Sequence, residues 1–359
     1  MNKAAPIVAS APGKLFLIGE YAVLEGAPAI LAAVDRRARV TLADASDGHW
    51  RLSAPNLDIH RLALGVDGRA PPDAGDGLRD RLRVYDAVLA HVAAELGTPL
   101  PPLDVHIDTT DFARDGHKLG LGSSAAVAAA LTQALLVRAG IDDVDHARLA
   151  RLAIAAHRQA QGGTGSGGDV ATAVYGGIIG YTQGRPPASL QWPPGLTVVA
   201  VVTGTGARTT DLVGRVQTYA GVHPRGFASD IARLAALAEN AADDLGQATC
   251  FARLAREYFE ALIALDRHAH AGIVSARHHE LHAMAARHGA VFKSSGAGGG
   301  DVGLLLATPH VNQSALRRDF DAAGAQIIEL GFAAPGVAIE GPAGRREPAR
   351  TRTGEPGLR

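Results

Sequence analysis

Three glycine-rich loops constrain this chain more than any other feature of its 359 residues. The first covers residues 120–126 (GLGSSAA), the second residues 161–169 (QGGTGSGGD) and the third residues 293–301 (KSSGAGGGD). Glycine at this density costs conformational entropy, and a fold keeps it where the backbone must turn with a positive φ or approach a ligand closely. One such loop is equally well explained as a tight turn. Three such loops in one chain favour a common ligand with several phosphates, which converging backbone N–H groups would bind.

The first loop has the features of an anion site. An Ala- and Leu-rich helix follows it to about Arg138, so the first N–H groups of that helix lack intrahelical partners. The helix dipole adds partial positive charge there, which suits phosphate. Ser123 or Ser124 can offer a hydroxyl to a phosphate or to Mg²⁺, or can serve as the helix N-cap. The loop is not a Walker A motif, because it lacks the Gly-Lys-Ser/Thr ending.

Two charged residues beside these loops are candidates for catalysis. Lys14 begins an otherwise apolar strand within residues 11–21 (APGKLFLIGEY). It is either solvated at a strand edge or directed at an anion, and the three nearby loops favour the anion. Asp169 leaves the second loop just before an apolar segment. There it can cap a helix, take part in catalysis, or do both.

Composition narrows the classes of partner. The formal net charge is -1, which gives no electrostatic basis for binding nucleic acid or an anionic membrane surface. Neither a signal peptide nor a run of ~20 apolar residues is found. His278, His279 and His282 lie on a polar helix with no cysteine or acidic cluster nearby, so we interpret them as a solvated face rather than a metal site. We expect a cytoplasmic protein with a small-molecule partner, either a monomer or a homodimer.

The alternation of strands with helices predicts an α/β or α+β fold in two lobes. Residues 225–288 have helical periodicity in about three segments. The tail is rich in Pro, Gly and Arg and nearly free of large apolar residues, so we expect it to be disordered. We place an N-terminal lobe at residues 1–185, a C-terminal lobe at 186–340 and the tail at 341–359.

The order of the motifs resembles that of the GHMP kinases. That family has a Pro-Gly-Lys strand near the N-terminus, a Gly-Leu-Gly-Ser-Ser-Ala-Ala loop and a C-terminal glycine-rich loop, which match residues 11–21, 120–126 and 295–301. The resemblance spans nearly the whole chain up to the tail. It implies an α+β fold of two lobes, the first nucleotide-binding and like domain 2 of ribosomal protein S5, the second ferredoxin-like. It also implies that ATP and Mg²⁺ bind between the lobes.

Within that family, the chain looks most similar to the kinases that phosphorylate mevalonate 5-phosphate. The first motif continues as residues 19–25 (GEYAVLE), where mevalonate kinases tend to have His in place of Tyr21. Lys118 just precedes the nucleotide loop, and the second and third loops are similar to those of the subfamily. One departure concerns the metal. Mevalonate kinases carry a Mg²⁺-binding Glu about eleven residues before the Asp of the second loop, and this chain has Arg158 there. The expected protein ligand of Mg²⁺ is then Ser123.

The resemblance also implies roles for single residues. Lys14 is expected to bridge donor and acceptor in the transition state, and Asp169 to orient Lys14 or, with a hydroxyl acceptor, to act as a base. Further possible ligands of an acceptor phosphate are Lys118, Lys293 and Arg208. The residues expected to bind ATP are Lys118, Gly120, Leu121, Gly122, Ser123, Ser124 and Ala125. Those expected to bind the acceptor are Lys14, Tyr21, Ser166, Gly167, Ser295, Gly296, Ala297 and Gly298.

The expected reaction is the ATP-dependent phosphorylation of mevalonate 5-phosphate to mevalonate 5-diphosphate, on the route to isoprenoids. Three alternatives stay open. The first is a GHMP kinase with a hydroxyl acceptor, such as mevalonate or a sugar. The second is a decarboxylase of the mevalonate diphosphate type, whose loop usually has Ala in place of Gly122. The third is a nucleotide- or sugar-binding regulator that keeps the fold without turnover, against which Lys14, Ser123 and Asp169 argue.

Overall fold

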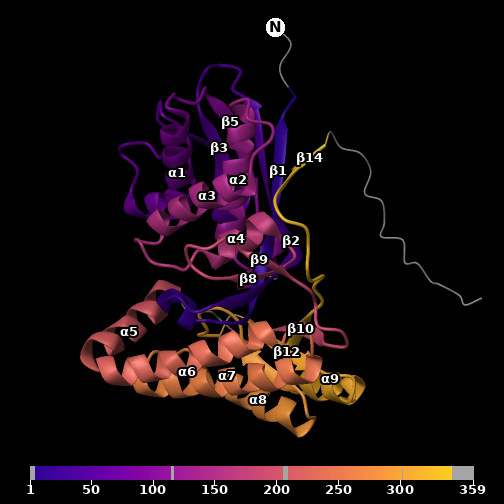
Figure 1. Ribbon diagram of the computed structural model, residues 1–359. Helices are drawn as coiled ribbons and strands as arrows, with labels where there is room; N and C mark the ends of the chain where they lie inside the picture. Colours follow the sequence, from indigo (N-terminus) through magenta and orange to yellow (C-terminus); the bar gives the residue numbers. More distant parts are fainter. Residues whose placement is uncertain (1–4, 115–116, 205–208, 301, 342–359) are drawn as a thin grey trace, which may run out of the picture.

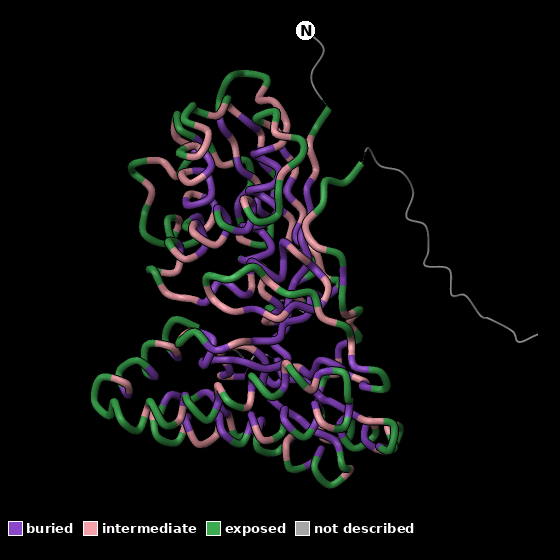
Figure 2. The backbone as a smooth tube through the Cα atoms, viewed as in Figure 1, coloured by how far each residue is buried: buried purple, intermediate pink, exposed green. Residues whose placement is uncertain are grey.

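A computed structural model of the chain has two lobes, upper and lower in Figure 1. It describes residues 5–114, 117–204, 209–300 and 302–341. Each lobe is built on one large sheet, and these sheets carry most of the strands of the chain. In both lobes the segments where sheet and helices face each other are buried (Figure 2), and most of the buried residues are apolar.

The N-terminal lobe contains a sheet of eight strands. Its central order is β14-β1-β2-β5-β3-β4, and β8 pairs with β2 and with β9. All pairs are antiparallel except β3 with β5. The strands are β1 (Ile7–Ile18), β2 (Ala29–Asp44), β3 (Arg51–Ala54), β4 (Ile59–Ala63), β5 (Leu103–Asp108), β8 (Ile178–Tyr181), β9 (Ala188–Leu190) and β14 (Ala338–Glu340).

Among the residues described, the helices that pack in this lobe are α1 (Asp76–Leu96), α2 (Ser123–Arg138), α3 (His146–Ala160) and α4 (Gly168–Tyr175). The central one is α2, because its residues from Ala125 to Leu136 are all buried. A helix that is apolar on every side belongs inside a lobe, and its many alanines let β1, β2, α1 and α3 approach closely. Short elements complete the lobe: β6 (Ala113–Arg114), β7 (His117–Lys118), and the 3₁₀ turns Ala22–Glu25, Pro55–Leu57 and Thr110–Phe112.

The C-terminal lobe has an antiparallel sheet of order β11-β12-β10-β13. Its strands are β10 (Thr197–Val202), β11 (Val291–Ser294), β12 (Val302–Ala307) and β13 (Gln326–Ile328). The helices that accompany it are α5 (Thr209–Val222), α6 (Pro224–Asp243), α7 (Ala248–Ala269), α8 (Ala276–Arg287) and α9 (Gln313–Ala322). The helical periodicity predicted for residues 225–288 corresponds to α6, α7 and α8, and it misses α5.

Two segments correct the predicted lobe boundaries. Strand β9 lies beyond residue 185 but pairs with β8, so the first lobe extends past the predicted division. Strand β14 lies in the predicted C-terminal lobe but pairs with β1, where Val8 faces Glu340. Both are three-residue strands, and their place is decided by pairing with a distant partner rather than by local pattern. The predicted disordered tail lies, from residue 342, outside the described residues.

The segment that leads to β14 lies against the first lobe. Arg37 donates to the carbonyl oxygens of Pro335 and Gly336 and to Ser10. A Cβ at Gly176 would lie 2.1 Å from the nitrogen of Gly336, so glycine is required for this approach. The chain therefore ends its described part in the lobe in which it begins. In the residues described, no helix combines the length and the apolar character needed to cross a membrane.

Candidate active site

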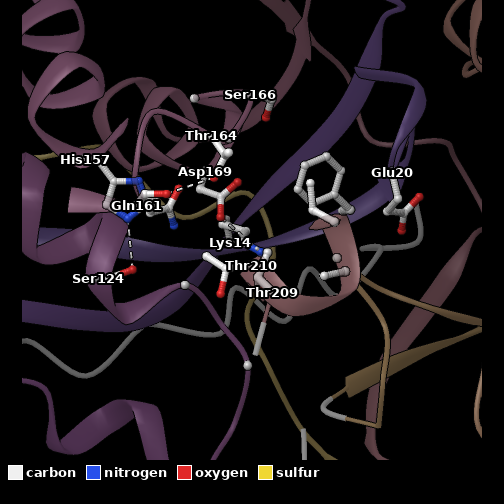
Figure 3. Close-up of a pocket in the computed structure, with 18 of the residues that line it drawn as sticks. Lys14, Glu20, Ser124, His157, Gln161, Thr164, Ser166, Asp169, Thr209 and Thr210 are labelled. Carbon is white, nitrogen blue, oxygen red and sulfur yellow. Dashed lines mark hydrogen bonds and ion pairs between the residues drawn. The ribbon is translucent and has the colours of Figure 1, made fainter. Parts of the chain in front are cut away.

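A cavity of about 560 Å³ opens between the two lobes. Its walls come from strand β1, the three glycine-rich loops, the end of α3 and the start of α5. Figure 3 looks into it and shows Lys14 and Asp169 side by side near its centre. The first and third loops lie more than a hundred residues apart in the chain, yet they meet around one space, as their composition predicts.

Lys14 stands on the wall formed by β1. A Cβ at Gly13 would lie 2.7 Å from the carbonyl oxygen of Leu121, so the glycine lets the first loop rest on the strand. The Lys14 N–H donates to the same oxygen over 2.8 Å. The Lys14 side chain is 8% exposed, and its Nζ lies 3.6 Å from Oδ2 of Asp169. The strand therefore holds the ammonium group next to both the first and the second loop.

The first loop leads directly into α2. The N-cap is Gly122, with a φ of 80°, and no side chain caps the helix, so the interpretation of a serine as N-cap is wrong. A Cβ at Gly122 would lie 2.9 Å from Cε of Lys14, so only glycine leaves room for the lysine stem. The start of α2, with its unpaired N–H groups, therefore meets the Lys14 ammonium at one cavity, an arrangement that favours anions.

Most residues predicted to bind ATP line this cavity. Ala125 does not, because it is buried behind the loop in the first turn of α2. Lys118, from the short strand β7, is exposed at the cavity edge. The lining residues of this set are Lys118, Gly120, Leu121, Gly122, Ser123 and Ser124.

Asp169 lies in the first turn of α4, not at its N-cap. The N-cap is Gly167, with a φ of 86°, and no side-chain cap hydrogen bond is present there. The predicted capping role is therefore not observed, and the carboxylate is paired with Lys14 instead. Ser166 and Gly167, both predicted to bind the acceptor, line the cavity beside it.

Arg158 shapes the second loop from α3. Its guanidinium donates to the carbonyl oxygens of Gly165 and Ser166 and to the side chain of Gln183. Arg158 therefore holds the backbone of the second loop, and it is not among the residues that line the cavity. The neighbouring residue His157 does line the cavity, and its Nε2 lies 3.0 Å from the hydroxyl oxygen of Ser124. Burial lowers the pKa of His157, with partial opposition from the Asp169 carboxylate.

The third loop is bonded to β1 through a side chain. The Ser295 hydroxyl accepts from the N–H of Phe16 over 2.9 Å and donates to the Phe16 carbonyl oxygen over 3.0 Å. Gly298 packs on Ile273, where a Cβ would lie 2.3 Å from the carbonyl oxygen. Neither Ser295 nor Gly298 belongs to the cavity lining, which differs from the prediction. Both instead anchor the loop to its surroundings.

Gly296 and Ala297 are the part of the third loop that reaches the cavity. Tyr21, from the turn after β1, lines the cavity as well and donates its hydroxyl proton to the Ala297 carbonyl oxygen over 2.6 Å. Burial is the main cause that raises the pKa of Tyr21. The hydroxyl is therefore a stable donor, and it ties the two lobes together at the cavity edge.

Lys293 corrects a prediction. Its side chain is fully buried, and its Nζ lies 2.5 Å from Oε1 of Glu20 and 2.6 Å from the Ser294 carbonyl oxygen. Burial lowers the pKa of Lys293, and the Glu20 carboxylate opposes that shift. Lys293 is therefore the internal counter-ion of Glu20 and not a ligand for an acceptor phosphate. Arg208, the other such candidate on the C-terminal side, lies outside the described residues.

Several lining residues were missed by sequence reasoning. Thr209 and Thr210 begin α5 and line the cavity, where Figure 3 labels them. Arg83, on α1, lines the cavity from the first lobe. The sequence did hold a signal for the two threonines. A strand, a glycine-containing segment and a helix follow one another at β10 and α5, as they do around the first loop, so the start of α5 could have been predicted to face the ligand. No local signal marks Arg83, which sits on a helix among other charged residues.

Of the three histidines predicted to form a solvated face, His279 is exposed as predicted, whereas His278 and His282 are not. His278 is fully buried and bonded to the Thr203 hydroxyl over 3.0 Å, and it closes a capping box with Ser275. His282 bonds the Phe292 carbonyl oxygen. His278 and His282 stabilise the fold, because the face of α8 that carries them is turned towards the interior of the lobe. In the described residues, no group of three or more His, Cys, Asp or Glu side chains could hold a metal ion.

The cavity lining carries an excess of positive charge. Lys14, Arg83 and Lys118 stand against Glu20 and Asp169 among the described lining residues. Since buried Lys293 already compensates Glu20, Asp169 is the carboxylate of this set left to balance the three cations. The cavity is therefore suited to ligands with several negative charges.

Comparison with known proteins agrees with this geometry. A model of the GHMP kinases N terminal domain matches residues 83–177. A phosphomevalonate kinase from Streptomyces sp. (strain CL190) is 32% identical over 374 residues, which cover 92% of this chain and 98% of that protein. A mevalonate kinase from Aeropyrum pernix is 34% identical over 215 residues, which cover 59% of this chain and 62% of that protein.

A solved structure shares the fold. Streptococcus pneumoniae phosphomevalonate kinase, in complex with phosphomevalonate and AMPPNP, superimposes with a TM-score of 0.73 at 21% identity, over 90% of this chain and 99% of that one. The predicted mixed α and β architecture is thereby confirmed. The finer assignment of each lobe to a ribosomal or ferredoxin-like subfold stays a prediction.

Proposed function

Since the chain belongs to the GHMP kinases and is a kinase of the mevalonate pathway, we propose that it transfers the γ-phosphoryl group of ATP to the phosphate of mevalonate 5-phosphate. The observation that carries this choice of acceptor is the cationic excess of the cavity, with Lys14 at its centre. The Streptomyces relative and the S. pneumoniae structure, both of phosphomevalonate kinases, support the same choice.

Charge is the main obstacle to this reaction. The acceptor phosphate is largely dianionic at neutral pH, since its second pKa is about 6, so it needs no general base. Two unit charges of like sign ~4 Å apart repel by about 4 kcal/mol at an effective dielectric constant of 20. An ammonium group between donor and acceptor removes much of this repulsion. We propose this role for Lys14, and its low exposure and its ion pair with Asp169 support the proposal.

The nucleotide is proposed to bind at the start of α2. The backbone N–H groups after Gly122 would bind the triphosphate, with Lys118 and Arg83 adding charge at the cavity edge. Hydroxyl oxygens suit Mg²⁺, which usually keeps several waters and phosphate ligands, so the lining fits this ion. Ser123, with Ser124 beside it, would hold it. When bound, Mg²⁺ neutralises charge on the phosphate oxygens.

The acceptor is proposed to bind between Lys14 and the third loop. Gly296 and Ala297 line the cavity, a Cβ on Gly296 would lie 3.7 Å from Lys14 Nζ, and the Tyr21 hydroxyl donates to the Ala297 carbonyl oxygen. Thr209 and Thr210 add hydroxyls from the start of α5. In this arrangement Asp169 orients the Lys14 ammonium and is not required to take a proton.

One observation favours a second candidate, a kinase with a hydroxyl acceptor. The Asp169 side chain is 32% exposed and lies in the cavity, so it could take the proton of a hydroxyl group. The Aeropyrum relative is a mevalonate kinase, which is consistent with this alternative.

The two candidates are separated by steady-state turnover. ADP release from Mg-ATP is measured by a coupled assay with mevalonate 5-phosphate and with mevalonate in parallel, and the Lys14→Met variant is the control for contaminating kinases. We expect rapid turnover with the phosphorylated acceptor alone. Turnover with mevalonate alone would replace the proposal by the second candidate, and nucleotide binding without turnover on either would favour a regulator.

A further inference from the structure

His157 has no role in the mechanism above, yet it lies inside the cavity. It belongs to the last turn of α3, its relative exposure is 4%, and it is one of the lining residues. Figure 3 shows its ring directed at Ser124, in the first turn of α2. The bond between Nε2 and the Ser124 hydroxyl spans 3.0 Å and joins residues 33 positions apart.

The ring constrains the Ser124 hydroxyl. A serine hydroxyl near a helix start can rotate among several partners, including nearby backbone groups. The roles in this bond depend on the tautomer of the ring. If Nε2 is the acceptor, the Ser124 O–H donates to it. If Nε2 carries the hydrogen, the Ser124 oxygen accepts from it and the O–H is left for another partner. In both cases the Ser124 oxygen is held at Nε2. Ser123 also lines the cavity, and among the residues that the structure describes its hydroxyl is not bonded to a histidine.

A buried histidine elsewhere in the chain provides a comparison. His278 bonds the Thr203 hydroxyl over the same 3.0 Å, but its Nδ1 also accepts from the Ser275 N–H as part of the capping of α8. His278 lies outside the cavity lining, as expected for a residue that stabilises the fold. His157 differs in that the hydroxyl it holds belongs to an exposed residue of the nucleotide loop.

We propose that His157 is a positioning residue of the nucleotide site, which acts through Ser124 by fixing the position of its hydroxyl oxygen. The role concerns ATP binding and therefore rests on the proposed nucleotide site but not on the identity of the acceptor. It distinguishes the two serines, since Ser124 is set by the protein before the nucleotide arrives and Ser123 is not.

The test uses two amides that differ in reach. His157→Gln places its terminal amide near the position of Nε2, whereas His157→Asn places it near Nδ1 and loses contact with Ser124. Affinity for a fluorescent ATP analogue is measured by titration in the presence of Mg²⁺. We expect H157Q to stay within ~3-fold of the wild type and H157N to bind about tenfold more weakly, which is the upper end of the effect of one neutral hydrogen bond.

A double-mutant cycle then shows whether the effect passes through Ser124. With Ser124→Ala in the background, H157Q and H157N should bind the analogue equally. With Ser123→Ala, the matched control, the tenfold difference should persist. Equal binding by H157Q and H157N in the wild-type background would overturn the proposal, as would an undiminished difference in the S124A background. If the wild type itself does not bind the analogue, the proposed nucleotide site fails instead. Melting temperatures of all variants identify any that are not folded. The ratio of the dissociation constants of H157N and H157Q is taken, within each background, from folded proteins alone.

Discussion

Gly122→Ala should impair catalysis far more than it impairs stability. The added methyl group would meet three carbons of Lys14, at 2.9, 3.1 and 3.5 Å from Cε, Cγ and Cδ. Ordinary carbon–carbon contact is ~3.5–4.0 Å, so the lysine stem must retreat by about 0.6–1 Å. The stem is flexible and can move, but its ammonium group then leaves its place near Asp169.

The two effects have different magnitudes. At a φ of 80°, a residue with a Cβ costs about 1–2 kcal/mol relative to glycine, which lowers the melting temperature by a few degrees in a chain of this size. A displacement of ~1 Å in the reacting groups can lower the rate about 10²-fold. We therefore expect kcat to fall by about two orders of magnitude while the protein stays folded.

Gly140→Ala is the matched control, at the other end of α2. Gly140 has a φ of 84° and no atom within 4 Å of a Cβ placed on it, so this variant has the conformational cost without the contact with Lys14. Both variants are compared by thermal melting and by steady-state ADP release. A similar melting temperature with kcat lost only in G122A supports the reasoning. If G122A keeps kcat within ~3-fold of G140A, the inference that Gly122 sets the position of Lys14 is wrong.

Three other predictions concern charged and titratable groups described above. Lys14→Ala should lower kcat by about 10³-fold, and more than Asp169→Asn, if the acceptor is phosphorylated; an equal or larger loss in D169N with binding intact would argue for a base. Lys293→Met should lower the free energy of unfolding in urea by about 3–5 kcal/mol, because the buried carboxylate of Glu20 loses its partner. Adding Glu20→Gln should recover most of that loss of stability. A loss below ~1 kcal/mol in K293M would contradict the inference that the two charges depend on each other. Burial lowers the pKa of His278 to about 4, below its unfolded value of about 6.5, so the associated stability is complete above pH 6.5 and is lost as the pH falls towards 4. Between pH 7 and pH 4.5, wild-type protein should lose about 2–3 kcal/mol more than His278→Gln in urea unfolding, and equal losses would exclude His278 as the cause.

Much of the candidate site was predictable because its parts are continuous in sequence. A short stretch of sequence is enough to recognise each of these parts: the glycines that need a positive φ, the serine pair at a helix start and the isolated lysine on an apolar strand. The convergence of Lys14 and Asp169 followed from the assumption that three phosphate-binding loops share a ligand. Their 3.6 Å separation agrees with that assumption.

The errors concern contacts between distant segments. Lys293 and Ser295 sit in a loop whose composition resembles a ligand site, but their partners Glu20 and Phe16 lie more than 270 residues away. Nothing in the local sequence separates a lysine that faces a phosphate from one that faces a buried carboxylate. His278 was misassigned for a similar reason, because the inward rotation of α8 depends on packing against α7 and β11.

The pairing of β14 with β1 also bears on the order in which the protein can be made. Strand β1 emerges from the ribosome first, but one of its edges stays unpaired until residues 338–340 have been synthesised. During translation, that edge is a template on which another chain could add a strand. A premature stop before Ala338 would make this temporary state permanent. A nascent chain of this kind is therefore an expected client of chaperones, and its yield in a cell-free system should rise when they are supplied.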